Sequence, residues 1–299
     1  MSFTIAESVD EALAALAAGA RPVAGGTDLV VGTRQGKADL PPSLVAIDRI
    51  EELDHIESGE HGTRIGATVT HSRLTVEPTI VSDYTALADA AALVGSPSTR
   101  NIGTLGGNIM NASPAMDTGA PLMVLGAVVQ LRSAGGSRAV ELSDLWTGPG
   151  QTSATADELC VAIEIPSRPE RSGSAYVRLE YRRAMEIAVV GAAASVTLAD
   201  DGTIVDGAVA LTAVAPTIIE VGSAGTSMTG LLPDAAAAVI ASAASDVARP
   251  ISDLRGSESY RRHTVGVMAT RAVDAAARRA AGEEISVPVN RAIGVGASR

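Results

Sequence analysis

Two short segments pair glycines with small polar residues, a composition that lets backbone N–H groups approach an anion. The first segment is Pro22-Val23-Ala24-Gly25-Gly26-Thr27-Asp28-Leu29, and the second is Thr104-Leu105-Gly106-Gly107-Asn108. Glycine allows close backbone approach, and successive amides form a concavity that binds anions. From the residues alone, a shared diphosphate site held by neutral dipoles and two ordinary tight turns remain equal alternatives, since the chain has 30 glycines.

Other residues exclude several classes of site. Neither segment reads GxxxxGK[ST] or GxGxxG, so the sequence supports neither a P-loop nor a Rossmann dinucleotide site. The single cysteine, Cys160, excludes an iron–sulfur cluster ligated within this chain and is expected to be a small core residue. The four histidines show no metal-ligand spacing, so we predict no metal site and no catalytic side chain. A net charge of −11 argues against nucleic acid as a partner.

Apolar spacing predicts the elements that position the two segments. We expect a helix from residue 9, capped at Ser8 and ended by Gly19, and short strands at 21–24, 29–31, 44–47 and 64–69. A helix is expected at 84–94, a hairpin around Gly135-Gly136, and a strand at 158–165. His71 follows Thr70 at an expected helix start, so a role in the cap or at the surface is predicted for it. The mixture indicates α and β layers.

The second half of the chain has a different pattern. After the charged segment 167–173 we expect three antiparallel strands, at 176–181, 187–198 and 203–214, and then helices at 233–247 and 257–281. We therefore divide the chain into domains 1–173 and 174–299. No leader-like segment and no apolar run of about 18 residues is present, so a soluble, cytoplasmic protein without a membrane span is expected.

The glycine segments carry a family resemblance. AGGTDLV at 24–30, followed by TLGGNIMNASPAMD at 104–117, resembles the FAD-binding medium subunit of the molybdenum hydroxylases, which include xanthine dehydrogenase, carbon monoxide dehydrogenase and nicotine dehydrogenase. Matches at Ser96-Pro97, Gly148-Pro149-Gly150 and Ala215-Pro216-Thr217 follow in the same order. The resemblance covers nearly the whole chain.

The resemblance implies an α+β fold. Residues 1–173 would form an FAD-binding domain of the vanillyl-alcohol-oxidase type (PCMH type) in two α+β lobes. Residues 174–299 would form the C-terminal domain found in carbon monoxide dehydrogenase flavoproteins, a three-stranded antiparallel sheet with helices.

The resemblance also implies a role in electron transfer. This chain would carry FAD, a large partner would carry molybdopterin, and a small partner would carry two [2Fe–2S] clusters, in a dimer of heterotrimers. Electrons would reach FAD from the clusters and leave to NAD or to another acceptor, such as a quinone, a cytochrome or oxygen. Two alternatives stay open: a stand-alone flavin-dependent oxidoreductase of the same fold, and a non-catalytic subunit whose cofactor site has decayed.

The same resemblance assigns roles to individual residues. The two glycine segments, residues 22–29 and 104–108, would hold the FAD diphosphate and ribityl chain. Asp117 would lie near the adenosine or ribityl hydroxyls, and Cys160 on the adenine side. Val94 matches a family contact, and Arg178 matches a basic residue near the flavin. Ile187 would cover one isoalloxazine face, with Glu186 beside it.

Overall fold

The first lobe of the molecule is a small parallel sheet with two helices. The computed structural model describes residues 2–36, 38–182 and 184–293. Strands β1 (Ser2–Ile5), β3 (Ser43–Ala46) and β2 (Arg21–Val23) pair in the order β1-β3-β2. Helix α1 (Val9–Ala17) begins where predicted, because the Ser8 side chain accepts a hydrogen bond from the Glu11 amide. Its apolar face packs on the sheet and closes a small core.

The segment 29–31 was predicted to be a strand, and this prediction is wrong. Residues Thr27–Arg34 form the helix α2. Gly26 adopts a left-handed conformation, with φ of 65°, which turns the chain away from the sheet after β2 ends at Val23. Val30 and Val31 have high strand propensity, but both lie exposed on this helix.

The second lobe contains an antiparallel sheet covered by short helices. Its strands run in the order β4 (Ile56–Gly59), β5 (Gly62–Gly66), β10 (Leu159–Pro166), β6 (Val128–Ser133) and β7 (Gly136–Glu141). The predicted hairpin joins β6 to β7. The remaining elements of this lobe are η1 (Glu51–Leu53), α3 (His71–Leu74), α4 (Pro78–Asp83), α5 (Thr85–Leu93), α6 (Pro97–Arg100), α7 (Leu105–Met110), α8 (Gly119–Val124), α9 (Leu142–Leu145), β8 (Trp146–Gly148) and β9 (Gln151–Thr152).

The C-terminal sheet has four strands, where three were predicted. Strands β11 (Ser172–Leu179), β12 (Val190–Leu198), β13 (Ile204–Thr212) and β14 (Ile219–Glu220) pair antiparallel in that order. The fourth strand is two residues long, too short to show the period-two pattern that identifies strands. The helices are α10 (Ala224–Met228), α11 (Pro233–Val247), α12 (Glu258–Ala280) and α13 (Val289–Ala292). The domain boundary at residue 173 stays a prediction, and β11 begins at Ser172.

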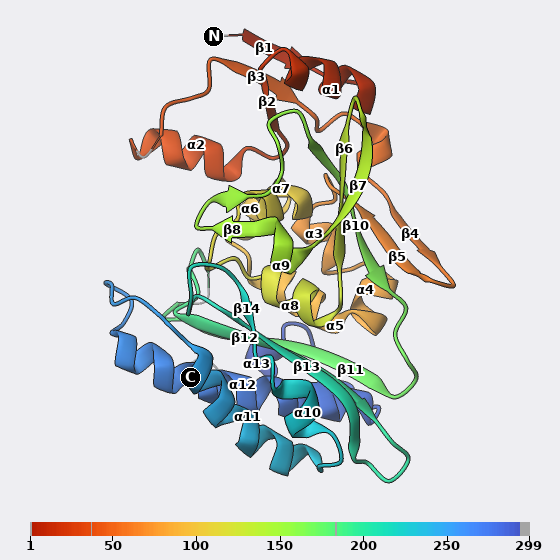
Figure 1. Cartoon of the computed structure of the whole chain (residues 1–299), viewed down its shortest axis with the longest axis vertical. Helices are drawn as coiled ribbons and strands as arrows, with labels where there is room; N and C mark the ends of the chain where they lie inside the picture. Colours follow the sequence, from red (N-terminus) through yellow and green to blue (C-terminus); the bar gives the residue numbers. More distant parts are fainter. Residues whose placement is uncertain (1, 37, 183, 294–299) are drawn as a thin grey trace.

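The C-terminal sheet is buried on both faces, and this places it directly against the second lobe. Ala175 and Val177 pack with α11 and α12, whereas Tyr176 packs into the core of the second lobe. Figure 1 shows the first lobe at the top, the second lobe below it, and the C-terminal sheet beneath, with α10, α11 and α12 on its far side.

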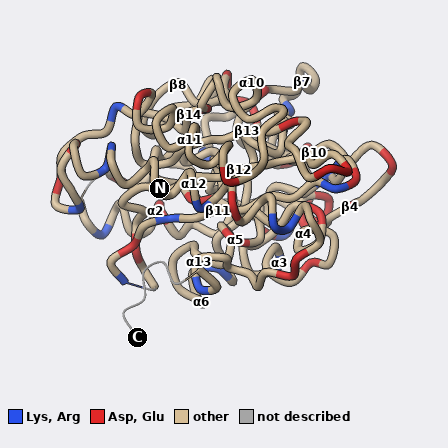
Figure 2. Tube along the Cα trace, turned by 90° about the horizontal axis from the view of Figure 1, so that it is seen from below, with Lys and Arg blue, Asp and Glu red and all other residues tan. Residues whose placement is uncertain are grey.

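A buried ion pair ties the two halves of the chain together. Asp89 on α5 is fully buried, and its carboxylate accepts hydrogen bonds from the Arg279 guanidinium on α12 at 2.6 and 3.1 Å. The amides of Tyr176 and Val289 donate to the same carboxylate at 3.2 and 2.8 Å. Figure 2 shows that acidic and basic positions elsewhere are interspersed along the trace.

Candidate functional site

The two glycine segments meet in space, although they are about 80 residues apart. Gly25 lies flat against the backbone that precedes the second segment, because a Cβ at this position would collide with the Ile102 carbonyl oxygen. Thr27 Oγ1 lies 3.6 Å from the point where Gly103 would carry a Cβ. The structure therefore brings together the predicted residues 22–29 and 104–108 into one site.

The first segment leaves its backbone donors open. Gly26 precedes the first residue of α2, and no side chain caps this helix. The amides of Gly25, Gly26, Thr27 and Asp28 donate no hydrogen bond to any residue that the structure describes. The amino terminus of an α-helix carries a partial positive charge and unpaired N–H groups, which together favour a bound anion.

The second segment uses most of its backbone donors within the fold. The Leu105 amide donates to the Val69 carbonyl, and the Gly106 amide to the Ala67 carbonyl, each at 2.9 Å. The Gly107 amide donates to the Thr104 hydroxyl at 3.1 Å, which caps α7. Of the polar side chains, Asn108 accepts from the Thr118 hydroxyl at 2.6 Å, which leaves its amide NH2 without a partner among the described residues.

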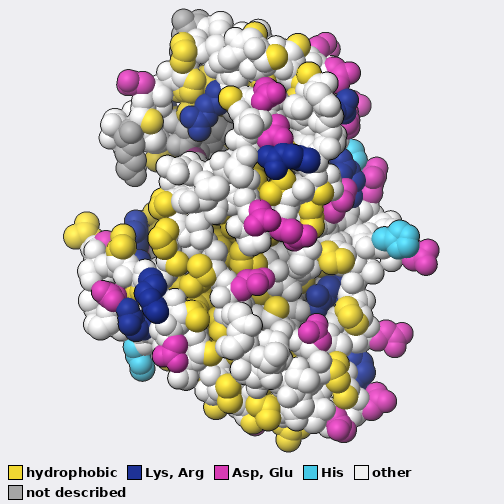
Figure 3. All heavy atoms as spheres, viewed as in Figure 1, with side chains coloured by type: hydrophobic (Ala, Val, Ile, Leu, Met, Phe, Trp, Pro, Cys, Tyr) yellow, Lys and Arg dark blue, Asp and Glu magenta, His cyan; other side chains and the backbone are white. Residues whose placement is uncertain are grey.

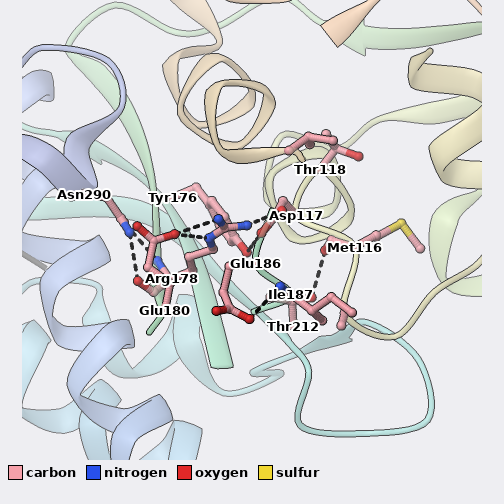
Figure 4. Close-up of polar contacts among 12 residues, drawn as sticks. Met116, Asp117, Thr118, Tyr176, Arg178, Glu180, Glu186, Ile187, Thr212 and Asn290 are labelled. Atoms are coloured by element: carbon pink, nitrogen blue, oxygen red, sulfur yellow. Dashed lines mark hydrogen bonds and ion pairs between the residues drawn. The ribbon is translucent and has the colours of Figure 1, made fainter. Parts of the chain in front are cut away.

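Asp117 and Arg178 lie in a buried network between the domains (Figure 4). Arg178 is fully buried, and its guanidinium lies 2.7 Å from Asp117 Oδ2 and 2.6 Å from Glu180 Oε2. The Tyr176 hydroxyl donates to Asp117 Oδ1 at 2.8 Å. Both Asp117 oxygens are thus engaged by this chain.

The charges of this network are fixed by their surroundings. Burial acts to lower the pKa of Arg178, but the Asp117 and Glu180 carboxylates outweigh it and raise the pKa above its ordinary value. Burial, followed by the Asp117 charge, raises the pKa of Tyr176 well above its ordinary value. The arginine therefore stays charged and the tyrosine stays protonated at neutral pH.

Sequence analysis missed three members of this network: Tyr176, Glu180 and Asn290. Asn290 pairs with the Arg178 backbone, accepting from its amide at 3.0 Å and donating to its carbonyl at 2.9 Å. Tyr176, Arg178 and Glu180 alternate with apolar residues along the strand, so their shared face was a readable signal. Nothing near Asn290 in the sequence marks it.

Val94, Glu186 and Ile187 also come together. The Met185 amide donates to the Gly95 carbonyl at 3.0 Å, which holds the segment 185–187 beside Val94. Glu186 pairs with Arg182 at 3.3 Å and accepts from the Ile187 amide at 3.2 Å. Ile187 is 47% exposed, so its side chain is free to cover a flat ring.

Cys160 is a core residue, as its apolar surroundings in the sequence predicted. It lies in β10 and packs with the core of the second lobe. Burial raises the pKa of its thiol to about 12, so the thiolate is absent at neutral pH. The adjacent Val161 carbonyl accepts from the Ala67 amide, and Ala67 in turn accepts from Gly106. A contact of Cys160 on the adenine side stays a prediction.

His71 meets one of the two alternatives predicted for it: it is the first residue of α3, next to the cap, but it does not lie at the surface. Thr70 does cap α3, accepting from the Arg73 amide at 3.3 Å, but His71 itself is 2% exposed instead of lying at the surface. Its backbone amide donates to the Gly103 carbonyl at 3.0 Å.

Within residues 2–36, 38–182 and 184–293, no cluster of three or more His, Cys, Asp or Glu side chains is placed to hold a metal ion. In the same residues, no helix has the length and apolar character needed to span a membrane.

In Figure 3 the outline of the molecule is notched below α2, between the first lobe and the C-terminal domain.

Sequence comparison finds relatives along nearly the whole chain. Residues 1–168 match the FAD binding domain in molybdopterin dehydrogenase, and residues 175–276 match the CO dehydrogenase flavoprotein C-terminal domain. The putative xanthine dehydrogenase FAD-binding subunit of Escherichia coli K12 is 32% identical over 268 residues, which cover 88% of this chain and 91% of that protein. The carbon monoxide dehydrogenase medium chain of Afipia carboxidovorans is 33% identical over 262 residues, 87% of this chain and 90% of the relative.

Solved structures share the fold. A chain of the Cu,Mo-CO dehydrogenase in its cyanide-inactivated form superimposes with a TM-score of 0.88 at 32% identity, over 93% of this chain and 99% of the other. A chain of quinoline 2-oxidoreductase from Pseudomonas putida 86 gives a TM-score of 0.87 at 28% identity, over 94% and 98%. The similarity therefore extends across both domains.

Proposed function

Because the chain belongs to the family of FAD-binding medium subunits of molybdenum hydroxylases, we propose that it transfers electrons through FAD in a heterotrimeric enzyme. It is the FAD subunit of a molybdopterin-containing dehydrogenase. A small partner would supply electrons from two [2Fe–2S] clusters, and a large partner would hold the molybdopterin. The acceptor would be NAD or another oxidant, and the assembly a dimer of heterotrimers.

The observation that carries this proposal is the convergence of the two glycine segments. The residues present fit FAD: four unpaired amides at the start of α2 suit a diphosphate, and the free Asn108 amide group suits a hydroxyl or phosphate oxygen. FAD, when bound, supplies the redox chemistry, taking electrons singly and giving them up singly or in pairs. The protein's part is to bind it, orient it and exclude water.

The remaining predicted residues divide into contacts and supports. Ile187, exposed beside Val94, would cover one face of the isoalloxazine ring, with Glu186 next to it. Asp117 and Arg178 would support the site indirectly, since their buried ion pair links the second lobe to β11 of the C-terminal domain. This arrangement supports a vanillyl-alcohol-oxidase-type domain of two lobes. A cytoplasmic location stays a prediction.

An absorption spectrum of the untagged protein, purified natively from its host, tests the proposal. Flavin bands with iron–sulfur absorbance and two further chains are expected. Flavin bands on a lone 30.1 kDa chain would instead favour the stand-alone oxidoreductase. The purified chain alone should oxidise no organic substrate, because the substrate pocket would lie on the large partner.

The variant Gly107→Val tests the placement of the cofactor. A Cβ at this position would lie 2.8 Å from the Thr104 hydroxyl that caps α7, so a branched side chain must displace that cap. We expect the variant to lose FAD. Full flavin occupancy in a folded variant would show that the site is assigned to the wrong segment.

A further inference from the structure

The loop that joins α11 to α12 carries an apolar patch that the described part of the chain leaves uncovered. Leu254 is fully exposed, and Ile251 is 70% exposed. Tyr181 and Tyr260 are exposed beside them, and the Tyr260 ring lies 3.2 Å from the point where Gly256 would carry a Cβ. Exposed apolar residues are ordinary when they are single, but four large ones on one loop mark an interaction site. The whole chain has only six aromatic residues, and two of them lie here.

The turn that presents Leu254, residues 251–256, is held in place by the fold. Asp253 and Gly256 exchange two backbone hydrogen bonds, each at 3.1 Å. The Asp253 carboxylate accepts from the buried guanidinium of Arg261 at 2.5 Å and from the Arg255 amide at 2.7 Å. A surface group that is already fixed loses little conformational entropy when a partner binds it. The turn is therefore suited to docking.

The turn borders the segment that would cover the flavin. The Tyr181 hydroxyl donates to the Arg255 carbonyl at 2.5 Å, and Tyr181 is followed by the segment 185–187, in which Ile187 would cover the isoalloxazine ring. In Figure 1 the loop between α11 and α12 protrudes at the left, beneath α2. In Figure 3 the same protrusion forms the lower edge of the notch and carries hydrophobic and basic side chains. A partner seated on the turn would therefore lie beside the predicted flavin position.

The charge of this region favours one of the candidate occupants. Residues 249–262 contain four arginines and two carboxylates, whereas the whole chain has a net charge of −11. Tyrosine and arginine are also the residue types enriched at the centres of protein interfaces. A second copy docked symmetrically through this turn would bring like charges together. The iron–sulfur subunit would hold clusters whose thiolate ligands make them negatively charged, and it is the partner that must approach the flavin to deliver electrons.

We propose that the turn 251–256, flanked by Tyr181 and Tyr260, is the docking surface for the small iron–sulfur subunit. Leu254 enters an apolar pocket of that subunit, and the arginines around the turn face its carboxylates. This contact brings the subunit to the edge of the flavin site. The inference rests on the proposed function, since it requires an iron–sulfur partner.

A photo-cross-link from the tip of the turn tests which chain lies there. Leu254→p-benzoylphenylalanine is introduced into the full chain, expressed with its partners in the natural host, and the cross-linked products are identified by mass. We expect a cross-link to the iron–sulfur chain. Leu232, exposed at the opposite end of α11, is the control position and should give no cross-link to that chain. A cross-link from Leu254 to the large chain or to a second copy, or to no partner in an assembled complex, would overturn the inference.

The variant Leu254→Asp measures the contribution of the contact. Purified iron–sulfur subunit is titrated against the full chain, and we expect its binding to weaken at least tenfold. The melting temperature should not change, because Leu254 packs against nothing. Leu232→Asp should leave both values unchanged. If the wild type binds the subunit and Leu254→Asp binds it equally well, the inference is wrong and the proposed function stands. If the wild type binds no iron–sulfur subunit, both proposals fail. Should Leu254→Asp lower the melting temperature, the cross-link decides.

Discussion

The two glycine segments look alike in sequence, but their backbone amides differ in whether the fold supplies them with hydrogen-bond partners. In the first, Gly25 to Asp28 present their amides to no other described residue. In the second, the amides of Leu105, Gly106 and Gly107 are consumed by the Ala67–Val69 backbone and by the Thr104 hydroxyl. The first segment therefore offers donors to a ligand, whereas the second is a scaffold that holds its neighbours in place.

The glycines of the two segments are required for different physical reasons. Gly25 and Gly106 both sit where a side chain would strike another backbone segment, so each permits a close approach of two chains. Gly26, in contrast, needs its positive φ to start α2, and a Cβ on it would meet only Val23 Cγ1 at 3.9 Å. In this chain a glycine doublet thus marks close packing of two segments as well as open backbone donors.

The largest expected effect comes from separating the two segments. In Gly25→Ala the new methyl group collides with the Ile102 carbonyl, so the first segment must move away from the second. FAD affinity should fall by about a hundredfold or more, roughly 3 kcal/mol. Fluorescence titration of the flavin-free chain measures it. Gly26→Ala is the control: only its backbone is strained, by about 1 kcal/mol, and it should bind FAD far better. Equal affinity in both variants would show that contact between the segments is not required.

A variant of the buried ion pair between the domains should lower the stability of the chain without weakening FAD binding. Arg279→Leu leaves Asp89 buried without its charge partner, and we expect the free energy of unfolding to fall by about 3–5 kcal/mol. The neighbouring Arg278, whose side chain is 42% exposed and pairs with Asp274 and Glu283, supplies the control, and Arg278→Leu should cost at most about 1 kcal/mol. Denaturant titration gives both values. A weaker affinity for FAD in folded Arg279→Leu would contradict the separation of roles.

The dependence of stability on pH tests whether His71 is buried and uncharged in the folded chain. The pKa of His71 is lowered from 6.5 to about 4 in the folded chain, so between these values the unfolded chain binds the proton more tightly. Stability should therefore fall as the pH drops through this window, by about 1.4 kcal/mol per pH unit more in the wild type than in His71→Gln. Parallel denaturation curves at pH 7 and pH 5 measure the difference. Identical pH profiles would mean that His71 is accessible to protons in the folded state.

The smallest expected effects come from two threonine variants, one in each glycine segment, and they test the different roles of the segments directly. Thr104→Ala removes the cap of α7 and should lower the stability of the flavin-free chain by about 1 kcal/mol. The Thr27 hydroxyl makes no hydrogen bond to another residue in the described ranges, so Thr27→Ala should leave that stability unchanged and weaken FAD binding instead. Thermal melts and FAD titrations on both variants give the answer. The reverse pattern would exchange the roles assigned to the two segments.

Local signals in the sequence predicted much of this structure. The cap at Ser8, the helix α11 and the hairpin between β6 and β7 all follow from patterns of a few neighbouring residues. The strand expected at 29–31 failed because propensity was read without knowing that Gly26 turns the chain away from the sheet. The glycine segments were found, but their division of work depends on the Ala67–Val69 backbone, which carries no motif.

Long-range partners were beyond the reach of such patterns. Asp89 lies in an alanine-rich helix, and nothing in its neighbourhood identifies Arg279, 190 residues later, as its partner. His71 follows a capping threonine, and its burial comes from the way the chain around Gly103 packs against α3. Both residues became interpretable only when the packing around them was known.

The ties between the domains also bear on how the chain tolerates being cut. The connection from β10 to β11 runs through exposed residues such as Glu170. The joint itself is made by the ion pairs Asp89–Arg279 and Asp117–Arg178 and by the packing of the C-terminal sheet into the core of the second lobe. Once the two domains have packed together, the covalent link between them therefore adds little to the stability of their interface. A molecule nicked at residue 170 should therefore still migrate as one particle.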